Sequence, residues 1–253
     1  MTGLIITCRA LCRRATLLHA GRRLAPAALA ALALAACAGP PYVDRQGPEP
    51  GMMAQLLEPV VFASGDQLAL APPRCIAILP FASALDQAEA SRQAESVRRA
   101  IYAHLAPRPP RDIELARVDA LLATLSPAAR RDYALLGDRL ACDTLLLGEL
   151  LEHRERYLVL YSEIVIGAEV ELVRATDGAV LWQARHIATS RGGAVPISPL
   201  AAIEGVVRAA ANLLGEERAR VTDDLARRLV RALPEAALPH AAEQAELVWA
   251  AAD

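Results

Sequence analysis

Strict alternation of apolar and polar side chains marks residues 163–173 as the clearest β-strand of the chain. One predicted face carries Ile164, Ile166, Ala168, Val170 and Leu172. The other carries Glu163, Val165, Glu169, Glu171 and Val173. After Asp177-Gly178, which favours a type I′ turn, the pattern returns with Val180, Trp182, Ala184 and Ala188 opposite Gln183, Arg185 and Thr189. The pattern predicts an antiparallel hairpin with one buried face and one face in water.

Continuous apolar runs predict two further strands, at 76–81 and 144–151, each covered on both faces. Helical spacing of apolar residues predicts a helix over 86–106, and a short strand is expected at 113–116. The other predicted helices cover 119–125, 126–140, 198–214 and 216–233. The order β-α-β-α-β, hairpin and C-terminal helices indicates a single α/β domain with a mixed β-sheet and flanking helices. Right-handed crossovers make strands 76–81 and 144–151 neighbours and place strand 113–116 outside them.

The N-terminal residues have the composition of an export signal rather than of a folded domain. Residues 1–23 contain five Arg and no acid, and residues 24–36 are an uncharged apolar run that is too short to span a bilayer. Leu34-Ala35-Ala36-Cys37 resembles the bacterial lipobox, in which the cysteine thiol is diacylated and becomes the first mature residue. The alternative is an Ala/Leu-rich helix that contains a cysteine.

These features predict a signal peptide at 1–36, a lipidated Cys37 with a Pro/Gly-rich tether at 37–73, the domain at 74–233 and a tail at 234–253. Val60-Val61-Phe62 is a candidate edge strand within the tether. Cleavage removes five Arg and leaves 22 Arg against 29 acids, a net charge of −7. Ala38 after the cysteine favours the outer membrane over the inner one, with the domain facing the periplasm and acyl chains as its membrane contact.

Two cysteines, Cys75 and Cys142, remain after the signal and the lipidated cysteine are set aside. Each precedes a predicted parallel strand, so the thiols fall at the same end of the sheet. In an oxidising compartment they form a candidate disulfide. The alternative is a pair of buried free thiols.

Composition excludes several kinds of chemistry. All 27 basic side chains are Arg, so there is no catalytic or P-loop lysine, and the formal charge of −2 argues against a nucleic-acid binder. His153 beside glutamates, joined by His186, is a weak metal hypothesis, and a solvated strand end is the alternative. Arg191-Gly192-Gly193 fits an anion-binding loop or a hairpin exit, and Trp182 fits a binding platform or core packing. We therefore expect no metal, no cofactor and no enzyme activity.

Three segments resemble lipoprotein families built on the CsgG-like (curli secretion channel) domain and the related DUF799, neisserial-antigen type. They are Ile76-Ala77-Ile78-Leu79-Pro80-Phe81, the stretch 140–149 (LACDTLLLGE) and the stretch 170–182 (VELVRATDGAVLW). The resemblance implies an α/β domain that works by association in envelope assembly or secretion, often as an oligomer. Lipoprotein activators of penicillin-binding proteins share this domain type.

The expected function is that of a lipid-anchored interaction protein in envelope biogenesis or secretion, with an unknown envelope protein partner and a possible homo-oligomer. A peptidoglycan synthase regulator and a periplasmic hydrolase with an unrecognised site are the alternatives. The candidate contact residues lie on the polar hairpin face and in the loop after it: Glu169, Glu171, Gln183, Arg185 and Arg191.

Overall fold

The computed structural model describes residues 40–49, 51–52, 58–85, 88–108, 111–158, 161–193 and 215–234, with side chains in β6 and β8 described to Arg156 and Gly192. The predicted signal peptide, Cys37, the predicted helix at 198–214 and the tail beyond Pro234 lie outside these residues.

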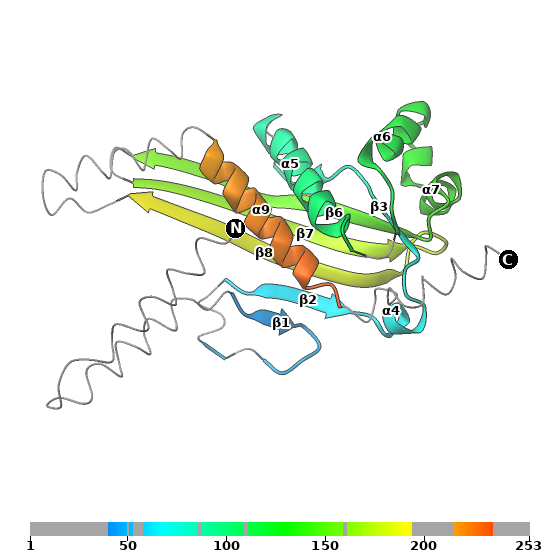
Figure 1. Ribbon diagram of the computed structural model, residues 1–253, viewed down its shortest axis with the longest axis horizontal. Helices are drawn as coiled ribbons and strands as arrows, with labels where there is room; N and C mark the ends of the chain where they lie inside the picture. Colours follow the sequence, from blue (N-terminus) through cyan, green and yellow to red (C-terminus); the bar gives the residue numbers. More distant parts are fainter. Residues whose placement is uncertain are drawn as a thin grey trace, which may run out of the picture. The chain divides into compact units, whose positions relative to one another are not determined.

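Eight strands form one sheet in the described part of the chain, in the order β1-β2-β8-β7-β6-β3-β5, with β4 paired to β6 (Figure 1). The strands are β1 (Tyr42–Asp44), β2 (Val60–Ser64), β3 (Cys75–Ile78), β4 (Ala82–Ser83), β5 (Arg111–Asp112), β6 (Thr144–Leu158), β7 (Tyr161–Arg174) and β8 (Val180–Gly193). The helices are α4 (Asp66–Leu70), α5 (Ala88–Leu105), α6 (Leu115–Thr124), the 3-10 turn η1 (Ala129–Arg131), α7 (Tyr133–Leu140) and α9 (Glu216–Arg231).

The strand pairing confirms the predicted mixed sheet. β3 lies between β5 and β6 and is parallel to both, with Ile76 opposite Thr144. β6, β7 and β8 are long antiparallel neighbours. As the right-handed crossovers required, the two apolar runs are adjacent and the short strand is outermost.

The alternation along β7 decides which side chains enter the core. Ile164, Ile166, Ala168, Val170 and Leu172 are at most 2% exposed and belong to the main core cluster. The predicted type I′ turn is wrong, because only Gly178 of the Asp177-Gly178 pair has a positive φ, at 71°. The turn is longer: the N–H of Gly178 donates to the carbonyl of Arg174 at 2.9 Å, and the Asp177 carboxylate accepts from the N–H of Ala179 at 3.0 Å.

Helices cover the two faces of the sheet unequally. α5 and α9 lie side by side across one face (Figure 1), where they enclose the main core cluster. α6 and α7 cover the opposite face only near β3, in a second cluster with Ala77, Leu145 and Val173. Trp182 lies in the main core and is 3% exposed, and its Nε1 donates to the carbonyl of Ala232 at 3.2 Å. It is therefore a packing residue rather than a binding platform.

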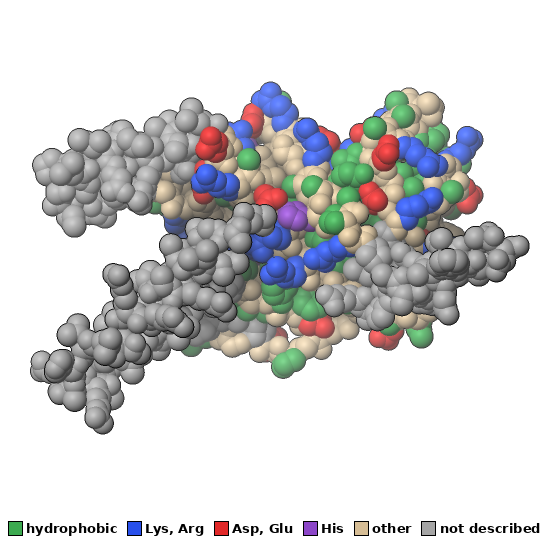
Figure 2. Space-filling view, viewed as in Figure 1, with side chains coloured by type: hydrophobic (Ala, Val, Ile, Leu, Met, Phe, Trp, Pro, Cys, Tyr) green, Lys and Arg blue, Asp and Glu red, His purple; other side chains and the backbone are tan. Residues whose placement is uncertain are grey.

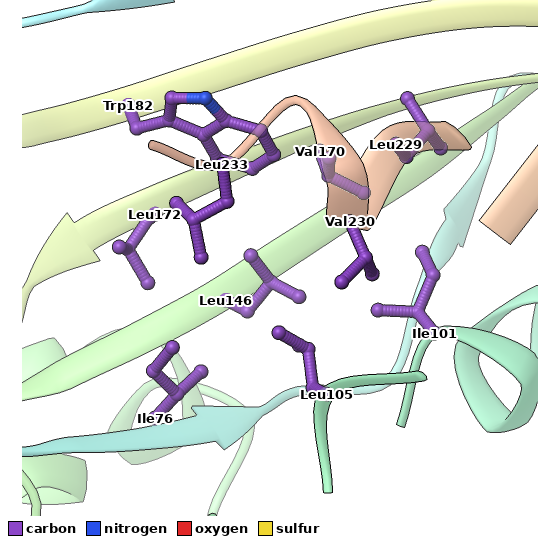
Figure 3. Close-up of a pocket in the computed structure, with 10 residues that line it drawn as sticks. All are labelled: Ile76, Ile101, Leu105, Leu146, Val170, Leu172, Trp182, Leu229, Val230 and Leu233. Carbon is purple, nitrogen blue, oxygen red and sulfur yellow. The ribbon is translucent and has the colours of Figure 1, made fainter. Parts of the chain in front are cut away.

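The main core has one small gap under the C-terminal turn of α9. Figure 3 shows ten apolar side chains around it, among them Ile101, Trp182 and Leu229. Its volume is about 10 Å³ and no polar atom lines it, so it is an imperfection of packing and not a ligand site.

A buried arginine holds the first helix of the domain to the sheet. Arg98 of α5 is 1% exposed, and its Nε and Nη2 donate to the carbonyl of Ile78, at the end of β3, at 3.3 and 3.0 Å. The same guanidinium is bidentate to the carboxylate of Asp119 on α6, at 2.8 and 3.1 Å. The sequence pattern placed Arg98 off the apolar stripe, but its contacts satisfy its charge inside the fold.

Several predicted elements between β3 and β6 have different bounds. The predicted strand at 113–116 is wrong, since β5 covers only Arg111–Asp112 and α6 already begins at Leu115. The predicted helix at 126–140 is divided into η1 and α7, because the carboxylate of Asp132 accepts from the N–H of Leu135 and caps α7. Gly137 allows α7 to approach Ala175 closely, since a Cβ there would lie 2.5 Å from the Cβ of Ala175.

The predicted tether differs most from the structure. Residues 60–70 form β2 and α4, and residues 42–44 form β1, so part of the stretch 37–73 belongs to the sheet. β2 is antiparallel to β8, with Val61 opposite Arg185, and β1 is parallel to β2. Val60-Val61-Phe62 therefore docks on the sheet as predicted. The edge position belongs instead to β1, which has too few apolar residues to be recognised as a strand.

Cys75 and Cys142 form a disulfide with a Cα–Cα distance of 5.2 Å. The parallel pairing of β3 and β6 brings them to the same end of the sheet. The carboxylate of Asp143 accepts from the N–H groups of Arg74 and Cys75, at 3.1 Å each, and the hydroxyl of Thr144 donates to the carbonyl of Cys75. The bond thus joins two chain segments that polar contacts already align.

His186 of β8 is a neutral buried base between β8, α9 and the start of β2. It is 2% exposed, its Nδ1 lies 3.4 Å from the carbonyl oxygen of Pro59, and its Nε2 lies 3.2 Å from Nη1 of Arg228. Burial, assisted by the charge of Arg228, lowers the pKa of His186 from 6.5 to about 4. The imidazole therefore accepts from Arg228 while its other nitrogen faces Pro59.

Replacing both cysteines, Cys75→Ser with Cys142→Ser, is expected to lower the free energy of unfolding. The disulfide closes a loop with a sequence separation of 67. Loss of this constraint on the unfolded chain corresponds to about 4 kcal/mol in the chain-entropy model. Urea unfolding of the oxidised protein and of the double variant measures the difference. Equal midpoints and slopes, or two reactive thiols in the native protein, would contradict the prediction.

His186 is expected to make the protein acid-sensitive. The unfolded chain takes up a proton near the ordinary histidine pKa of 6.5, whereas the folded protein takes it up only near 4. As the pH falls between these values, the free energy of unfolding decreases, by about 3 kcal/mol in total. Urea unfolding at several pH values tests this against His186→Gln, which lacks the titration. The same loss of stability on acidification in both proteins would refute the assignment.

Candidate interaction surface

Among the described residues, no helix covers the sheet face opposite α5 and α9 at residues 169–171 of β7 and 183–185 of β8. We call this surface the open face and define it by Glu149 of β6, Glu169 and Glu171 of β7, and Gln183 and Arg185 of β8. In the described residues, α6 and α7 pack on this side of the sheet only as far as the second core cluster, which contains Val173 of β7 and no residue of β8. Four of the five predicted contact residues, all but Arg191, therefore lie together here.

The strand register fixes the neighbours within the open face. Glu169 lies opposite both Glu149 on β6 and Arg185 on β8, and Glu171 lies opposite Gln183. Directly opposed carboxylates repel one another, so Glu149 and Glu169 favour a positively charged group over them. Arg185 is exposed, whereas Glu169 and Glu171 are half-buried. The surface thus combines a net negative charge with one mobile positive side chain.

Arg191 is separated from this group and is already paired. The predicted loop at Arg191-Gly192-Gly193 is wrong: these residues continue β8, with Arg191 opposite Glu163. Nε of Arg191 donates to Oε1 of Glu163 at 3.1 Å, and this hydrogen bond lowers the pKa of Glu163 and raises that of Arg191. Six residues of strand place Arg191 about 20 Å from Arg185. Arg191 therefore lies outside the open face, and neither an anion-binding loop nor a flexible exit exists there.

A groove with a volume of about 610 Å³ borders the open face where it meets η1 and α7. Glu149, Glu169 and Glu171 form its acidic side, Arg130 and Arg131 of η1 its basic side, and Leu79 with Pro80 after β3 an apolar part. It lies beyond the carboxyl end of β3, where open α/β sheets commonly bind ligands. Arg130 and Arg131 were not predicted from the sequence, because their position depends on α7, which packs on β6 and contacts η1.

The long strands also leave backbone edges unpaired. β4 pairs with β6 at Glu149 and Leu150, and β2 pairs with β8 as far as Arg185. In the described part of the chain, no strand pairs with the outer edges of β6 and β8 beyond these points. Charged residues on β6 from Glu152 to Arg156 oppose pairing of this edge with a strand of another molecule. The β8 edge has only Arg191 as such a residue.

The predicted metal hypothesis is not supported by the geometry of the two histidines. His153 Nε2 lies 3.1 Å from Oε1 of Glu155, and Arg218 of α9 is paired with the same carboxylate, its Nη2 at 2.8 Å from Oε2. His186 instead contacts Pro59 and Arg228. Within the described residues, no three His, Cys, Asp or Glu side chains are grouped as a metal site would require. The strand end at His153 is also not solvated, since His153 and Glu155 are only 6% and 15% exposed.

The face formed by α5 and α9 presents a different surface. Figure 2 shows basic and acidic side chains intermixed over these helices. Arg228 pairs with Asp224 at 2.5 Å, and His104 Nε2 lies 2.8 Å from Asp223. Because opposite charges are paired within this face, it has less unsatisfied charge than the open face. No described helix is both long and apolar enough for a bilayer span.

Comparison with known proteins gives structural similarities only. No protein-family model matches the chain, and no curated protein matches it. Among solved structures, lipoprotein GNA1162 from Neisseria meningitidis is 18% identical, with a TM-score of 0.36 over 56% of this chain and 97% of that one. A PelC dodecamer from Paraburkholderia phytofirmans is 20% identical, with a TM-score of 0.33 over 59% and 93%.

The C-terminal domain of LpoB from Salmonella enterica is 10% identical, with a TM-score of 0.28 over 45% of this chain and 80% of that one. These three identities lie below 25% and the TM-scores below 0.5. The similarities therefore carry no inference about function, which depends on the residues of this chain.

Proposed function

We propose that this protein is an outer-membrane lipoprotein that faces the periplasm and acts as a non-catalytic interaction component in envelope biogenesis or secretion. Acyl chains on Cys37 would anchor it, and the open face would bind an envelope protein. The observation that carries the proposal is the open face itself: a sheet surface on which three carboxylates, those of Glu149, Glu169 and Glu171, line a groove of about 610 Å³.

The chemistry of the open face favours binding over catalysis. Its carboxylates are exposed or half-buried, so they are accessible to the side chains of a partner. Its neighbours are Gln183 and Arg185 rather than a nucleophile paired with a base. A flat, charged strand surface suits a partner with basic side chains. The resemblance of three segments to CsgG-like and DUF799-type domains supports the same class of function.

Cys37→Ala is expected to abolish lipidation and release the mature protein from the membrane, because the thioether requires the thiol. Mass spectrometry of the N-terminal peptide and fractionation of outer and inner membranes measure both effects. Cys8→Ala, within the predicted signal peptide, is the control and should leave acylation unchanged. Normal acylation of the Cys37→Ala protein would reject the proposed anchor.

A photo-crosslinking residue in place of Arg185 is expected to give a discrete adduct with an envelope protein in living cells. The same residue in place of Arg99, an exposed arginine of α5, is the matched control. Glu171→Arg should weaken the adduct by about tenfold or more, since like charges across an interface cost several kcal/mol. Electrophoresis and mass spectrometry identify the adduct.

The identity of that adduct separates the candidate roles. A peptidoglycan synthase would indicate the regulator, and a second copy of this chain would indicate a homo-oligomer. Equal adducts from positions 185 and 99 would contradict a binding role for the open face. A turnover lost in Glu169→Gln, with the adduct unchanged, would indicate a hydrolase instead.

A further inference from the structure

The sheet begins unusually close to the proposed anchor. The N–H of Val60 donates to the carbonyl of Pro41 at 2.9 Å, and Tyr42 lies opposite Val60 in the parallel β1–β2 pair. Pro41 is thus already held to the sheet edge. From Cys37 to Pro41 the chain advances four residues, which span at most about 14 Å when fully extended. A flexible tether over residues 37–73, as predicted from the sequence, would instead have allowed a distance of roughly 30 Å or more between Cys37 and the domain.

This reach decides which part of the domain is nearest to the bilayer. β1 forms one edge of the sheet and β5 the other, with six strand-to-strand steps between them. At about 4.8 Å per step, the β5 edge lies roughly 29 Å from β1. With its acyl chains inserted, the connection therefore holds the β1 edge at the headgroups, whereas the β5 edge can stand well away from them.

The surface chemistry of the first segment fits this position. Tyr42 of β1 is 38% exposed and Met52 of the following segment is 77% exposed, and both are among the few large apolar side chains exposed in the described residues. A tyrosine with its apolar ring and polar hydroxyl is suited to the boundary between lipid and water. Arg45 follows β1 and is exposed, and its N–H donates to the carbonyl of Phe62 at 2.8 Å. The guanidinium can thus reach lipid phosphates while the backbone stays on the sheet.

We infer that the β1 edge, with Tyr42 and Arg45, is a membrane-apposed surface that contacts phospholipid headgroups. The inference rests on the proposed acylation of Cys37 and extends it from an anchor to an orientation. The sheet then stands with its β1 edge at the bilayer. β2 and β8 follow at increasing distance from the headgroups. The open face is then roughly perpendicular to the membrane plane. It is turned toward other proteins attached to the same leaflet.

Depth-dependent quenching tests this orientation with the mature acylated protein in phosphatidylethanolamine–phosphatidylglycerol vesicles. A fluorophore is placed at Gln46→Cys, after β1, or at Ala123→Cys, on α6 beside β3, with the disulfide left oxidised. A nitroxide on the lipid headgroups is the quencher. Position 46 is expected to be quenched at least about twofold more than position 123, because roughly 24 Å of sheet separates β1 from β3.

Two variants separate apposition from simple tethering. Insertion of about 20 Gly/Ser residues between Gly39 and Pro40 adds roughly 25 Å of reach and should make the quenching at the two positions nearly equal. Tyr42→Ser should reduce the quenching at position 46 while acylation is unchanged. Circular dichroism checks that both variants are folded.

The outcomes distinguish the two proposals. Equal quenching at positions 46 and 123 in the acylated protein without the insertion would overturn the membrane-apposed surface and leave the anchor intact. A mature chain without acyl mass on Cys37 would overturn both. Greater quenching at position 46 that the insertion does not reduce would also overturn the proposed role of the short connection.

Discussion

The register of β7 between β6 and β8 is the constraint on which the remaining structure depends. Side chains alternate between the faces of a strand, so a slip by one residue would exchange Ile166 and Val170 with Glu169 and Glu171. The core between the sheet and the α5–α9 layer would then receive carboxylates, and the open face would become apolar. Burial of Ile164 to Leu172 on one side therefore also determines where the acidic residues are displayed.

Local patterns and the handedness of crossovers predicted several parts of the fold. The hairpin, the parallel neighbours β3 and β6 and the position of the two cysteines follow from alternation, apolar runs and crossover handedness. β1 and the last residues of β8 could not be predicted in this way. Tyr42–Asp44 is too short to show an alternating pattern, and Gly192 has no preference for β-structure, so both become strand through their pairing with β2 and β7.

The same dependence on local sequence patterns explains which residues of the candidate interaction surface could be predicted. Glu169, Glu171, Gln183 and Arg185 were predicted together because they belong to one hairpin, whose register the sequence pattern encodes. Arg130 and Arg131 border the same groove but come from η1, whose placement depends on the packing of α7 against β6. Arg98 shows another limit of local pattern: this charged residue is buried because the carbonyl of Ile78 and the carboxylate of Asp119 satisfy it.

The strand order joins these results into one argument about orientation. The chain enters the sheet at β1, and β2, β8, β7 and β6 follow in that order. The distance of each open-face residue from the β1 edge therefore depends on the number of strands between them. Arg185 is the nearest, Glu169 and Glu171 are one strand farther, and Glu149 is two. If the β1 edge is held at the bilayer, charge on the open face changes with height, from positive near the headgroups to negative above them. A partner would complement this gradient with acidic groups near the membrane and basic groups farther from it.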